Sequence, residues 1–201
     1  LRYEWFAELC SKFGYAAIAV AHNANDNAET LILNLLRGTG TRGLRGMAQV
    51  GTIPVQGSTV KLIRPMLQFS RSQIEEQMLS WGLTWREDRT NHDTLYKRNK
   101  IRNEVFPVFA GINPSFIDTI GADIRHFTEV DDIAQEYFET VKGTVCDGSS
   151  ISVPALLSLK HWRYVLFRLL EQYGFDSSSC EKLVNALEDR TGTFSGKIFE
   201  S

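Results

Sequence analysis

An apolar strand pattern, followed at once by a polar turn and an amphipathic helix, constrains the fold of this chain more than any other feature. Residues 16–21 (AAIAVA) form an uninterrupted apolar run, which is typical of a buried parallel strand. His22–Asn25 follow as a polar turn, and apolar spacing then predicts a helix from Asp26 to Arg37 that ends at Gly38. This strand–turn–helix unit predicts an α/β fold with a parallel sheet. Ligands of such folds bind beyond the carboxyl ends of the strands.

Further helices and one hairpin are predicted from apolar spacing and from turn residues. Ser70 and Gln73 have the spacing of a capping box, which predicts a helix that ends at Gly82. A basic helix is predicted from Leu95 to Phe106, and it would end at Pro107. The other predicted elements are a helix over 2–13, strands over 52–56 and 59–63, and helices over 117–141, 154–173 and 179–187.

The turn residues at 111–114 divide the chain into two predicted domains. We predict an α/β domain over residues 1–112 and a small all-helical domain over residues 113–190. Residues 191–201 would begin a further domain or form a tail. Leu1 already lies within the first helical pattern, so we expect that the α/β domain is incomplete at its N-terminus.

Composition excludes several classes of protein. Hydrophobic residues make up 43% and charged residues 23% of the chain, which is typical of a globular protein rather than a disordered one. No apolar run approaches the roughly 20 residues of a membrane span, and no leader pattern is present, so we expect a cytoplasmic protein. The three cysteines lack the spacing of a zinc site or of a C-x-x-C pair, which predicts reduced thiols.

The net charge of −2 conceals a difference between the two halves of the chain. Residues 1–110 contain 14 Lys and Arg against 10 Asp and Glu, a net charge of +4, whereas residues 111–201 contain 8 against 14, a net charge of −6. The overall charge argues against a generic nucleic-acid binder. A basic first half is expected if only that half contacts phosphates.

Two carboxylates on the helix after the apolar strand are candidates for chemistry. The predicted buried stripe of this helix comprises Ala28, Leu31, Ile32 and Leu35. Asp26 and Glu29 lie three residues apart on the opposite face, with Thr30 and Arg37, so both carboxylates can reach one ligand. Such a pair can hold Mg²⁺ or orient an amine, but it can equally complement the helix dipole without any function. The residues alone leave both interpretations open.

Two basic segments are candidates for phosphate contacts. Residues 38–43 match G-x-G-x-x-G but follow a helix, which excludes the dinucleotide-binding fingerprint. Their amides, with the neighbouring Arg37, Arg42 and Arg45, suit phosphate or an RNA backbone. Arg98 and Arg102 lie four residues apart on one face of the basic helix. A solvated basic face is the alternative for both segments.

Three segments together resemble the tRNA(Ile)-lysidine synthetases of the PP-loop ATP pyrophosphatase superfamily. The first is AVAHNANDNAETLILNLLRGTGTRGLRGM at 19–47, and the second is LIRPML with the following helix start, at 62–74. The third is EDRTNHDTLYKRNKIRNEVFP at 87–107. The resemblance implies an adenine nucleotide alpha hydrolase-like domain with a parallel sheet. It further implies ATP and Mg²⁺ as cofactors, L-lysine as a substrate and an isoleucine tRNA with a CAU anticodon as partner; a homodimer is left open.

The family adenylates the wobble cytidine of that tRNA, and the ε-amine of lysine then displaces AMP to give lysidine. The resemblance implies catalytic roles for Asp26, Glu29 and Arg98, with Asp26 and Glu29 as Mg²⁺ ligands. It implies ATP or lysine contacts for His22, Thr30, Arg37, Gly38, Thr39, Gly40 and Gly43. It implies tRNA or phosphate contacts for Arg42, Arg45, Asp88, Asn91, Asn99 and Arg102.

The chain departs from the family pattern in two places. Asn25 stands where the family usually has the first acid of an Asp-Asp pair, and the phosphate-binding S-G-G-x-D-S loop is absent. We therefore expect a truncated piece of an active enzyme. A PP-loop tRNA sulfur transferase and a non-catalytic tRNA-binding module are the alternatives. The spacing of Cys10, Cys146 and Cys180 supplies no cysteine pair for sulfur transfer.

Overall fold

A computed structural model describes residues 2–55, 58–86, 97–148, 150–175 and 177–188 of the chain. The contacts among Cα atoms divide the chain into two compact units, residues 1–129 and residues 130–201. The division falls within one long helix, α7 (Phe116–Val145). The boundary that we predict at residues 112–113 stays a prediction, and residues 191–201 lie outside the described part.

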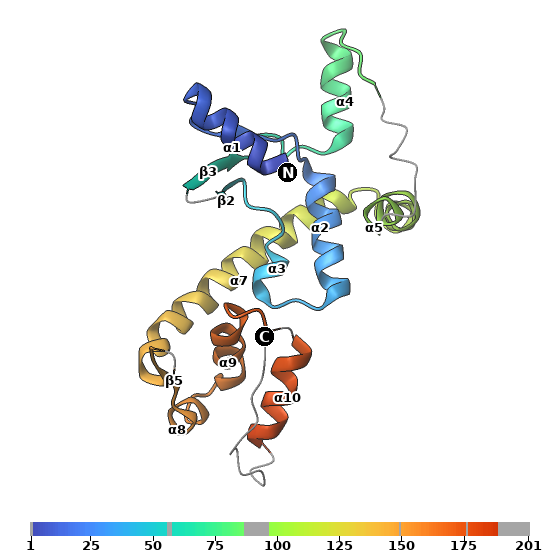
Figure 1. Cartoon of the computed structure of the whole chain (residues 1–201). Coiled ribbons are helices and arrows are strands. Elements are labelled where there is room, and N and C mark those ends of the chain that lie inside the picture. The colour runs from blue at the N-terminus through green and yellow to red at the C-terminus, as the bar shows by residue number, and fades with distance from the viewer. Residues whose placement is uncertain (1, 56–57, 87–96, 149, 176, 189–201) are drawn as a thin grey trace. The chain divides into compact units, whose positions relative to one another are not determined.

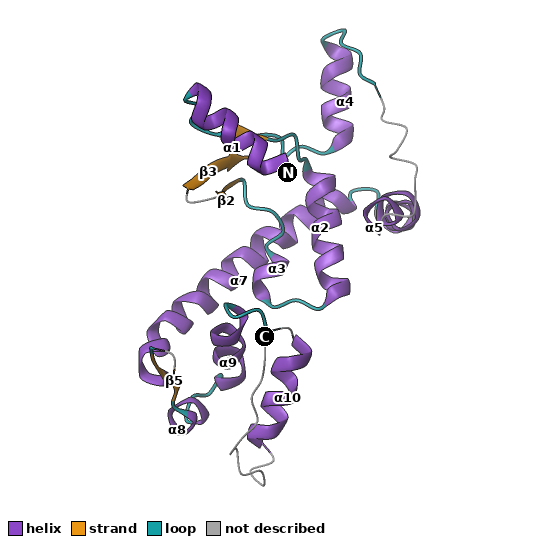
Figure 2. Cartoon of the chain, in the orientation of Figure 1, coloured by secondary structure: helices purple, strands orange, loops and turns teal. Residues whose placement is uncertain are grey.

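The first unit contains a small mixed sheet, with its helices and strands shown in Figure 1 and Figure 2. Its elements are α1 (Arg2–Phe13), β1 (Ile18–Ala19), α2 (Ala24–Arg37), α3 (Thr41–Leu44), β2 (Val50–Val55), β3 (Ser58–Ile63), α4 (Arg71–Ser80), α5 (Lys97–Lys100), η2 (Ile101–Val105) and α6 (Phe106–Ile112), together with the first half of α7. The strand order is β1-β3-β2. β1 is parallel to β3, with Ile18 opposite Leu62, and β2 is antiparallel to β3. The predicted parallel strand and the predicted hairpin are therefore confirmed.

Two apolar clusters stabilise this unit. In the first, Ala7 and Cys10 of α1 pack on Ile18, Val60 and Leu62 of the sheet. In the second, α2 packs on the helical segments that follow residue 97; its buried members are Ala28, Leu33, Ile101 and Phe106. The second cluster determines which elements surround the carboxylates of α2.

The helix predicted to end at Pro107 continues instead to Ile112. Pro107 lies in the first turn of α6, where a missing backbone N–H costs little. Immediately before it, the N–H of Phe106 donates to the carbonyl of Ile101, five residues back, so the helix is locally widened at η2. The prediction of an end at Pro107 was wrong because proline is compatible with a new first turn.

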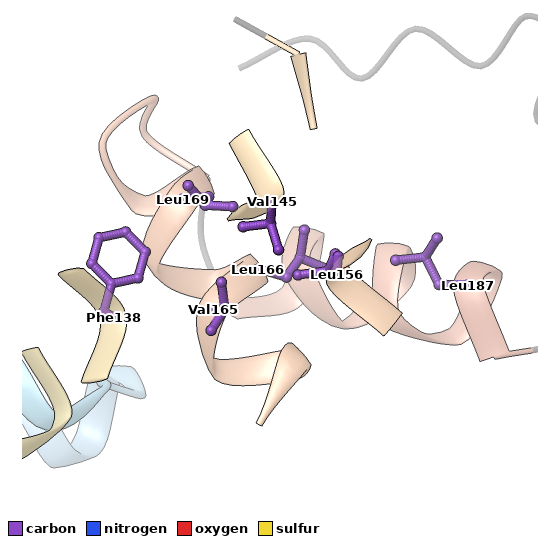
Figure 3. Packing of buried hydrophobic residues seen from close by; sticks show 7 residues of the cluster. All are labelled: Phe138, Val145, Leu156, Val165, Leu166, Leu169 and Leu187. Carbon is purple, nitrogen blue, oxygen red and sulfur yellow. The ribbon is translucent and has the colours of Figure 1, made fainter. Parts of the chain in front are cut away.

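The second unit is mainly helical, with α8 (Val153–Leu157), α9 (Trp162–Glu171) and α10 (Ser177–Glu188) after α7. It also contains a short antiparallel pair, β4 (Cys146–Asp147) and β5 (Ser150–Ile151). Figure 3 shows its core, which comprises Phe138, Val145, Leu156, Val165, Leu166, Leu169 and Leu187. The predicted helix over 154–173 is split into α8 and α9. None of the helices in the described residues is both long and apolar enough to cross a membrane.

Candidate functional site

The first turn of α2 positions Asp26. Asn23 Oδ1 accepts the N–H of Asp26 at 3.1 Å, and Asp26 Oδ2 accepts the N–H of Asn23 at 3.0 Å, which forms a capping box. α2 therefore begins at Ala24, two residues before the predicted start. The other carboxylate oxygen, Asp26 Oδ1, lies 3.1 Å from the Arg102 guanidinium.

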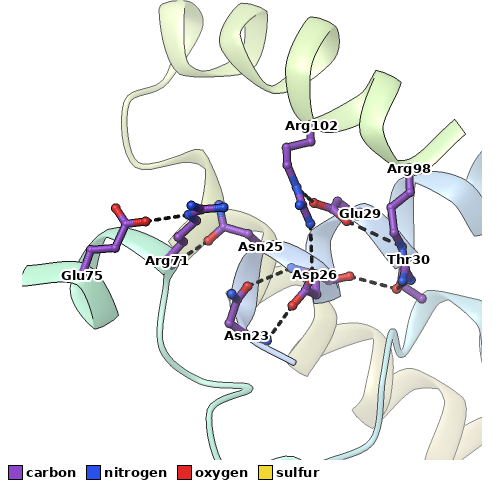
Figure 4. A network of polar contacts seen from close by, with 9 residues as sticks. All are labelled: Asn23, Asn25, Asp26, Glu29, Thr30, Arg71, Glu75, Arg98 and Arg102. Carbon is purple, nitrogen blue, oxygen red and sulfur yellow. Dashed lines mark hydrogen bonds and ion pairs between the residues drawn. The ribbon is translucent and has the colours of Figure 1, made fainter. Parts of the chain in front are cut away.

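Glu29, one turn further along α2, is fully buried. Its Oε1 accepts a hydrogen bond from Arg102 Nε at 2.7 Å, and its Oε2 lies 3.6 Å from Arg98 Nε. Figure 4 shows Arg102 between the two carboxylates. The prediction that Asp26 and Glu29 can reach one ligand thus agrees with the structure, but the group that both contact is the guanidinium of Arg102.

The predicted faces of α2 were wrong at two positions. Glu29 is buried although we placed it on the polar face, and Leu35 is 52% exposed although we placed it in the apolar stripe. Glu29 is buried because α5 and η2 cover the side of α2 that carries it. Spacing along one helix does not reveal which of its faces a distant segment will cover.

Arg98 and Arg102 project from α5 and η2 toward α2, as their four-residue spacing predicts. Arg98 also donates to Thr30 Oγ1 at 3.0 Å, and Thr30 Oγ1 donates to the carbonyl of Asp26 at 2.9 Å. Two arginines, two carboxylates and a threonine therefore form one network. Arg102 lies in the widened turn η2, and such turns are frequent at functional sites.

Burial raises the pKa of the Glu29 carboxyl above its ordinary value, and the hydrogen bond and charge of Arg102 oppose this shift only in part. The orphaned Oε2 agrees with this direction, because among the described residues it has no hydrogen-bond donor. A raised pKa means that the folded state binds the proton more tightly than the unfolded state does. The resulting stabilisation is present at low pH and is lost as the pH rises through the folded pKa.

We therefore expect Glu29→Gln to change how stability depends on pH. The free energy of unfolding of the wild type, minus that of the variant, should fall as the pH rises from below about 4.3, the ordinary glutamate pKa, through the raised pKa of Glu29. Chemical denaturation at a series of pH values measures this difference between the two free energies of unfolding. Glu76→Gln, at an exposed position of α4, is the matched control for loss of one carboxylate. A difference that stays constant or rises with pH would contradict the assignment.

A hollow of about 440 Å³ opens beside Asp26, and its lining residues are Asn23, Asn25, Asp26, Arg71, Arg102 and Asn103. Asn25, at the position where an acid was expected, accepts the N–H of Arg71 at 2.9 Å and so connects α2 to the start of α4. Arg71 in turn donates to Glu75 at 2.6 Å. Sequence reasoning missed Arg71 as a lining residue because nothing in its local pattern links it to α2.

The donor set beside this hollow fits Mg²⁺ only in part. Asp26 lines the hollow, and Mg²⁺ is commonly held by one or two carboxylates together with substrate phosphates. Glu29 does not line it, and its oxygens face two arginines. Within the described residues, no group of three His, Cys, Asp or Glu could hold a metal ion. Among the described residues that line this hollow, Asp26 is the carboxylate suited to Mg²⁺, and the predicted pairing of Asp26 with Glu29 as ligands stays a prediction.

The glycine-rich segment folds against the second half of α2. Asn34 Nδ2 donates to the carbonyl of Gly43 at 2.9 Å, and a Cβ at Gly43 would lie 1.8 Å from Thr39 Oγ1. Thr30, Arg37 and Arg98 line a second hollow, of about 300 Å³. Gly38, Thr39 and Gly40 precede α3, which contains Arg42 and Gly43, and Arg45 is its C-cap.

The remaining predicted site residues are placed as follows. His22 Nδ1 accepts a hydrogen bond from Arg64 Nε at 3.2 Å, and Arg64 also donates to the carbonyl of Ala48 at 2.7 Å. Sequence reasoning missed Arg64, although it lies in the second of the three resembling segments. Asn99 lies in α5 and is half-buried. Asp88 and Asn91 lie outside the described residues.

Comparisons with known proteins show similarity over the whole chain. Residues 1–109 match the PP-loop domain family, and residues 146–201 match the TilS substrate binding domain family. A tRNA(Ile)-lysidine synthase of Porphyromonas gingivalis strain W83 is 33% identical over 192 residues, which are 96% of this chain and 41% of that protein.

Two further relatives carry the same name. The tRNA(Ile)-lysidine synthase of Parabacteroides distasonis is 35% identical over 202 residues, 100% of this chain and 43% of that protein. That of Dehalococcoides mccartyi is 41% identical over 121 residues, 60% of this chain and 26% of that protein. The chain thus spans less than half the length of these curated relatives.

Proposed function

This chain belongs to the PP-loop domain family, and from that premise we propose that the protein is an ATP-dependent ligase that forms lysidine in an isoleucine tRNA. The observation that carries the proposal is the order of two matches on one chain, a PP-loop domain followed by a TilS substrate binding domain. Relatives that align with the whole chain are named tRNA(Ile)-lysidine synthase. The proposed substrates are ATP, L-lysine and a tRNA with a CAU anticodon. Because these substrates occur together in the cytoplasm, we propose that the protein acts there.

The proposed reaction has two steps. The oxygen on C2 of the wobble cytidine attacks the α-phosphorus of ATP, and pyrophosphate leaves. The ε-amine of lysine then attacks C2, so that a C–N bond forms, the C2–O bond breaks and AMP departs with that oxygen. Adenylation converts a poor leaving group into a phosphate ester, and the protein must orient the amine and remove its proton.

The described residues support distinct roles in this reaction. Asp26 lines the 440 Å³ hollow, so we assign to it the contact with the lysine amine or with Mg²⁺. A bound Mg²⁺ would neutralise charge on the phosphates. Arg98 is 43% exposed beside Thr30 and can contact a phosphate, whereas Glu29 is buried and acts as a positioning residue through Arg102.

Incorporation of labelled lysine tests the proposal. The full-length protein should transfer [¹⁴C]lysine to isoleucine tRNA with a CAU anticodon, and only when ATP is present. The matched control is the same tRNA with its wobble cytidine changed to uridine, which should accept no lysine. Binding of the tRNA without any ATP-dependent incorporation would favour a non-catalytic tRNA-binding module. Sulfur transfer is not favoured, because no close pair of cysteines occurs in the sequence.

A further inference from the structure

A separate hollow of about 890 Å³ lies within the first unit, and neither Asp26 nor Glu29 lines it. Its walls come from the start of α2, the end of α3, residues 45–49, Leu67 with Gln68, and the first half of α7. Its volume is within the range of pockets that hold small ligands. The proposed reaction, as assigned above, makes no use of it.

The lining of this hollow combines an apolar surface with cations. Ile124 of α7 and Leu67 are buried apolar side chains in its lining. Its arginines come from two walls, with Arg42 and Arg45 at α3 and Arg125 on α7. Gln49, Gln68 and Asp118 add hydrogen-bonding groups. An apolar surface for a flat base, cations for phosphate and amides for base edges together match an unstacked nucleotide.

One wall of the hollow is held in place by Asn27. The buried Asn27 side chain accepts the N–H of Met47 at 2.7 Å. Gly46 precedes Met47 with a φ of +61°, and a Cβ there would lie 2.3 Å from Asn27 Oδ1. The loop therefore needs glycine at this position, and the wall is formed before any ligand binds.

Gly121, on the opposite wall, has no such conformational reason to be glycine. It lies inside α7, where glycine is less stable than alanine, and a Cβ would meet only Arg125 Nη1, at 3.9 Å. The absent side chain keeps space open in the hollow instead.

We propose that this hollow binds one unstacked nucleotide of the RNA substrate, with Arg125 on its phosphate and the small Gly121 leaving room for its base. The inference rests on the proposed function for the identity of the RNA. Arginines on two separate walls suit the successive phosphates of a chain, since a single triphosphate such as that of ATP needs donors that converge. The proposal places Arg42 and Arg45 on one wall of the hollow as RNA contacts, and it adds Arg125 as a further contact with the RNA.

Filling the hollow tests this inference. Gly121→Leu should weaken binding of isoleucine tRNA by about tenfold or more, on the scale of one lost base contact, because the leucine side chain would fill the space of the base. The affinity of the Gly121→Leu variant for ATP should stay unchanged. Gly143→Leu is the matched control, because Gly143 lies in the same helix, has no atom within 4 Å of an added Cβ and does not line the hollow. Both leucines favour the helix, so neither should lower its stability.

A second variant measures the phosphate contact. Arg125→Ala should weaken tRNA binding and reduce the slope of log affinity against log salt by about one. Unchanged tRNA affinity in Gly121→Leu, or an equal loss of affinity for ATP, would overturn the inference. A wild type that binds the tRNA without incorporating lysine refutes the proposed function instead, and the same binding measurements still decide what the hollow does.

Discussion

Replacing Arg102 with alanine is expected to destabilise the first unit by about 3 kcal/mol, the lower end of the range for breaking a buried ion pair. Glu29 is fully buried, and Arg102 Nε donates to it at 2.7 Å. Without that guanidinium, the cation that remains beside Glu29 among the described residues is Arg98, whose Nε is 3.6 Å away and whose side chain is 43% exposed. The carboxylate would have to stay charged without its donor or take up a proton, and either one costs free energy.

Chemical denaturation measures this loss, and two further variants show its cause. Adding Glu29→Gln to Arg102→Ala should recover part of the stability, because the buried charge is then absent. Arg163→Ala is the matched control: Arg163 pairs with Glu188 at an exposed site, where an ion pair contributes about 1 kcal/mol or less. Equal losses in Arg102→Ala and Arg163→Ala would show that burial of Glu29 does not determine the effect.

Asp26→Asn should lower ATP-dependent incorporation of lysine by at least about 100-fold, the scale of a lost acid–base or charge contact in a transition state. The fold should persist, because an asparagine oxygen can still accept the N–H of Asn23 and so keep the capping box. The variant removes the negative charge that faces the 440 Å³ hollow. The variant also weakens the ion pair with Arg102, so the free energy of unfolding should fall modestly while the main loss appears in turnover.

Incorporation of labelled lysine, with circular dichroism of the same samples, measures this effect. Glu76→Gln removes a carboxylate from an exposed position of α4 and should leave incorporation unchanged. Arg98→Ala should also abolish incorporation, since Arg98 and Asp26 are both linked to Thr30. Undiminished incorporation in both site variants would refute the assignment of catalytic roles to this network.

The local elements of the first unit could be predicted from the sequence because their signals are short-range. The helix over 2–13 has the predicted bounds, and Ser70 forms the predicted capping box with Gln73. The start of α2 was predicted two residues late because Asn23, and not a later residue, caps the helix. The predicted end at Pro107 was wrong because proline is also compatible with the first turn of a helical segment, where Pro107 lies in α6.

The residues of the candidate site could be identified from the sequence, but the contacts among them could not. Asp26, Glu29, Arg98 and Arg102 were identified from spacing and resemblance, yet the burial of Glu29 followed from the packing of α5 and η2 on α2. Asn25 gave no signal of its contact with Arg71, which lies 46 residues further along the chain. Such long-range pairs depend on where whole elements pack, and one sequence does not encode that in any local pattern.

The sequence by itself determined the class of fold, the amphipathic helix that bears both carboxylates and the shared face of Arg98 and Arg102, because the periodicity of a strand or a helix makes these local properties. The tertiary structure alone decided which carboxylate is buried and which lines a hollow. It also decided that Arg102 contacts both of them, and that Gly121 and Arg125 line the same hollow as Arg42 and Arg45. How the elements pack together decides whether a side chain is buried and whether charges that are distant in the sequence come into contact. Packing changes the free-energy cost of a charged side chain far more than local spacing does.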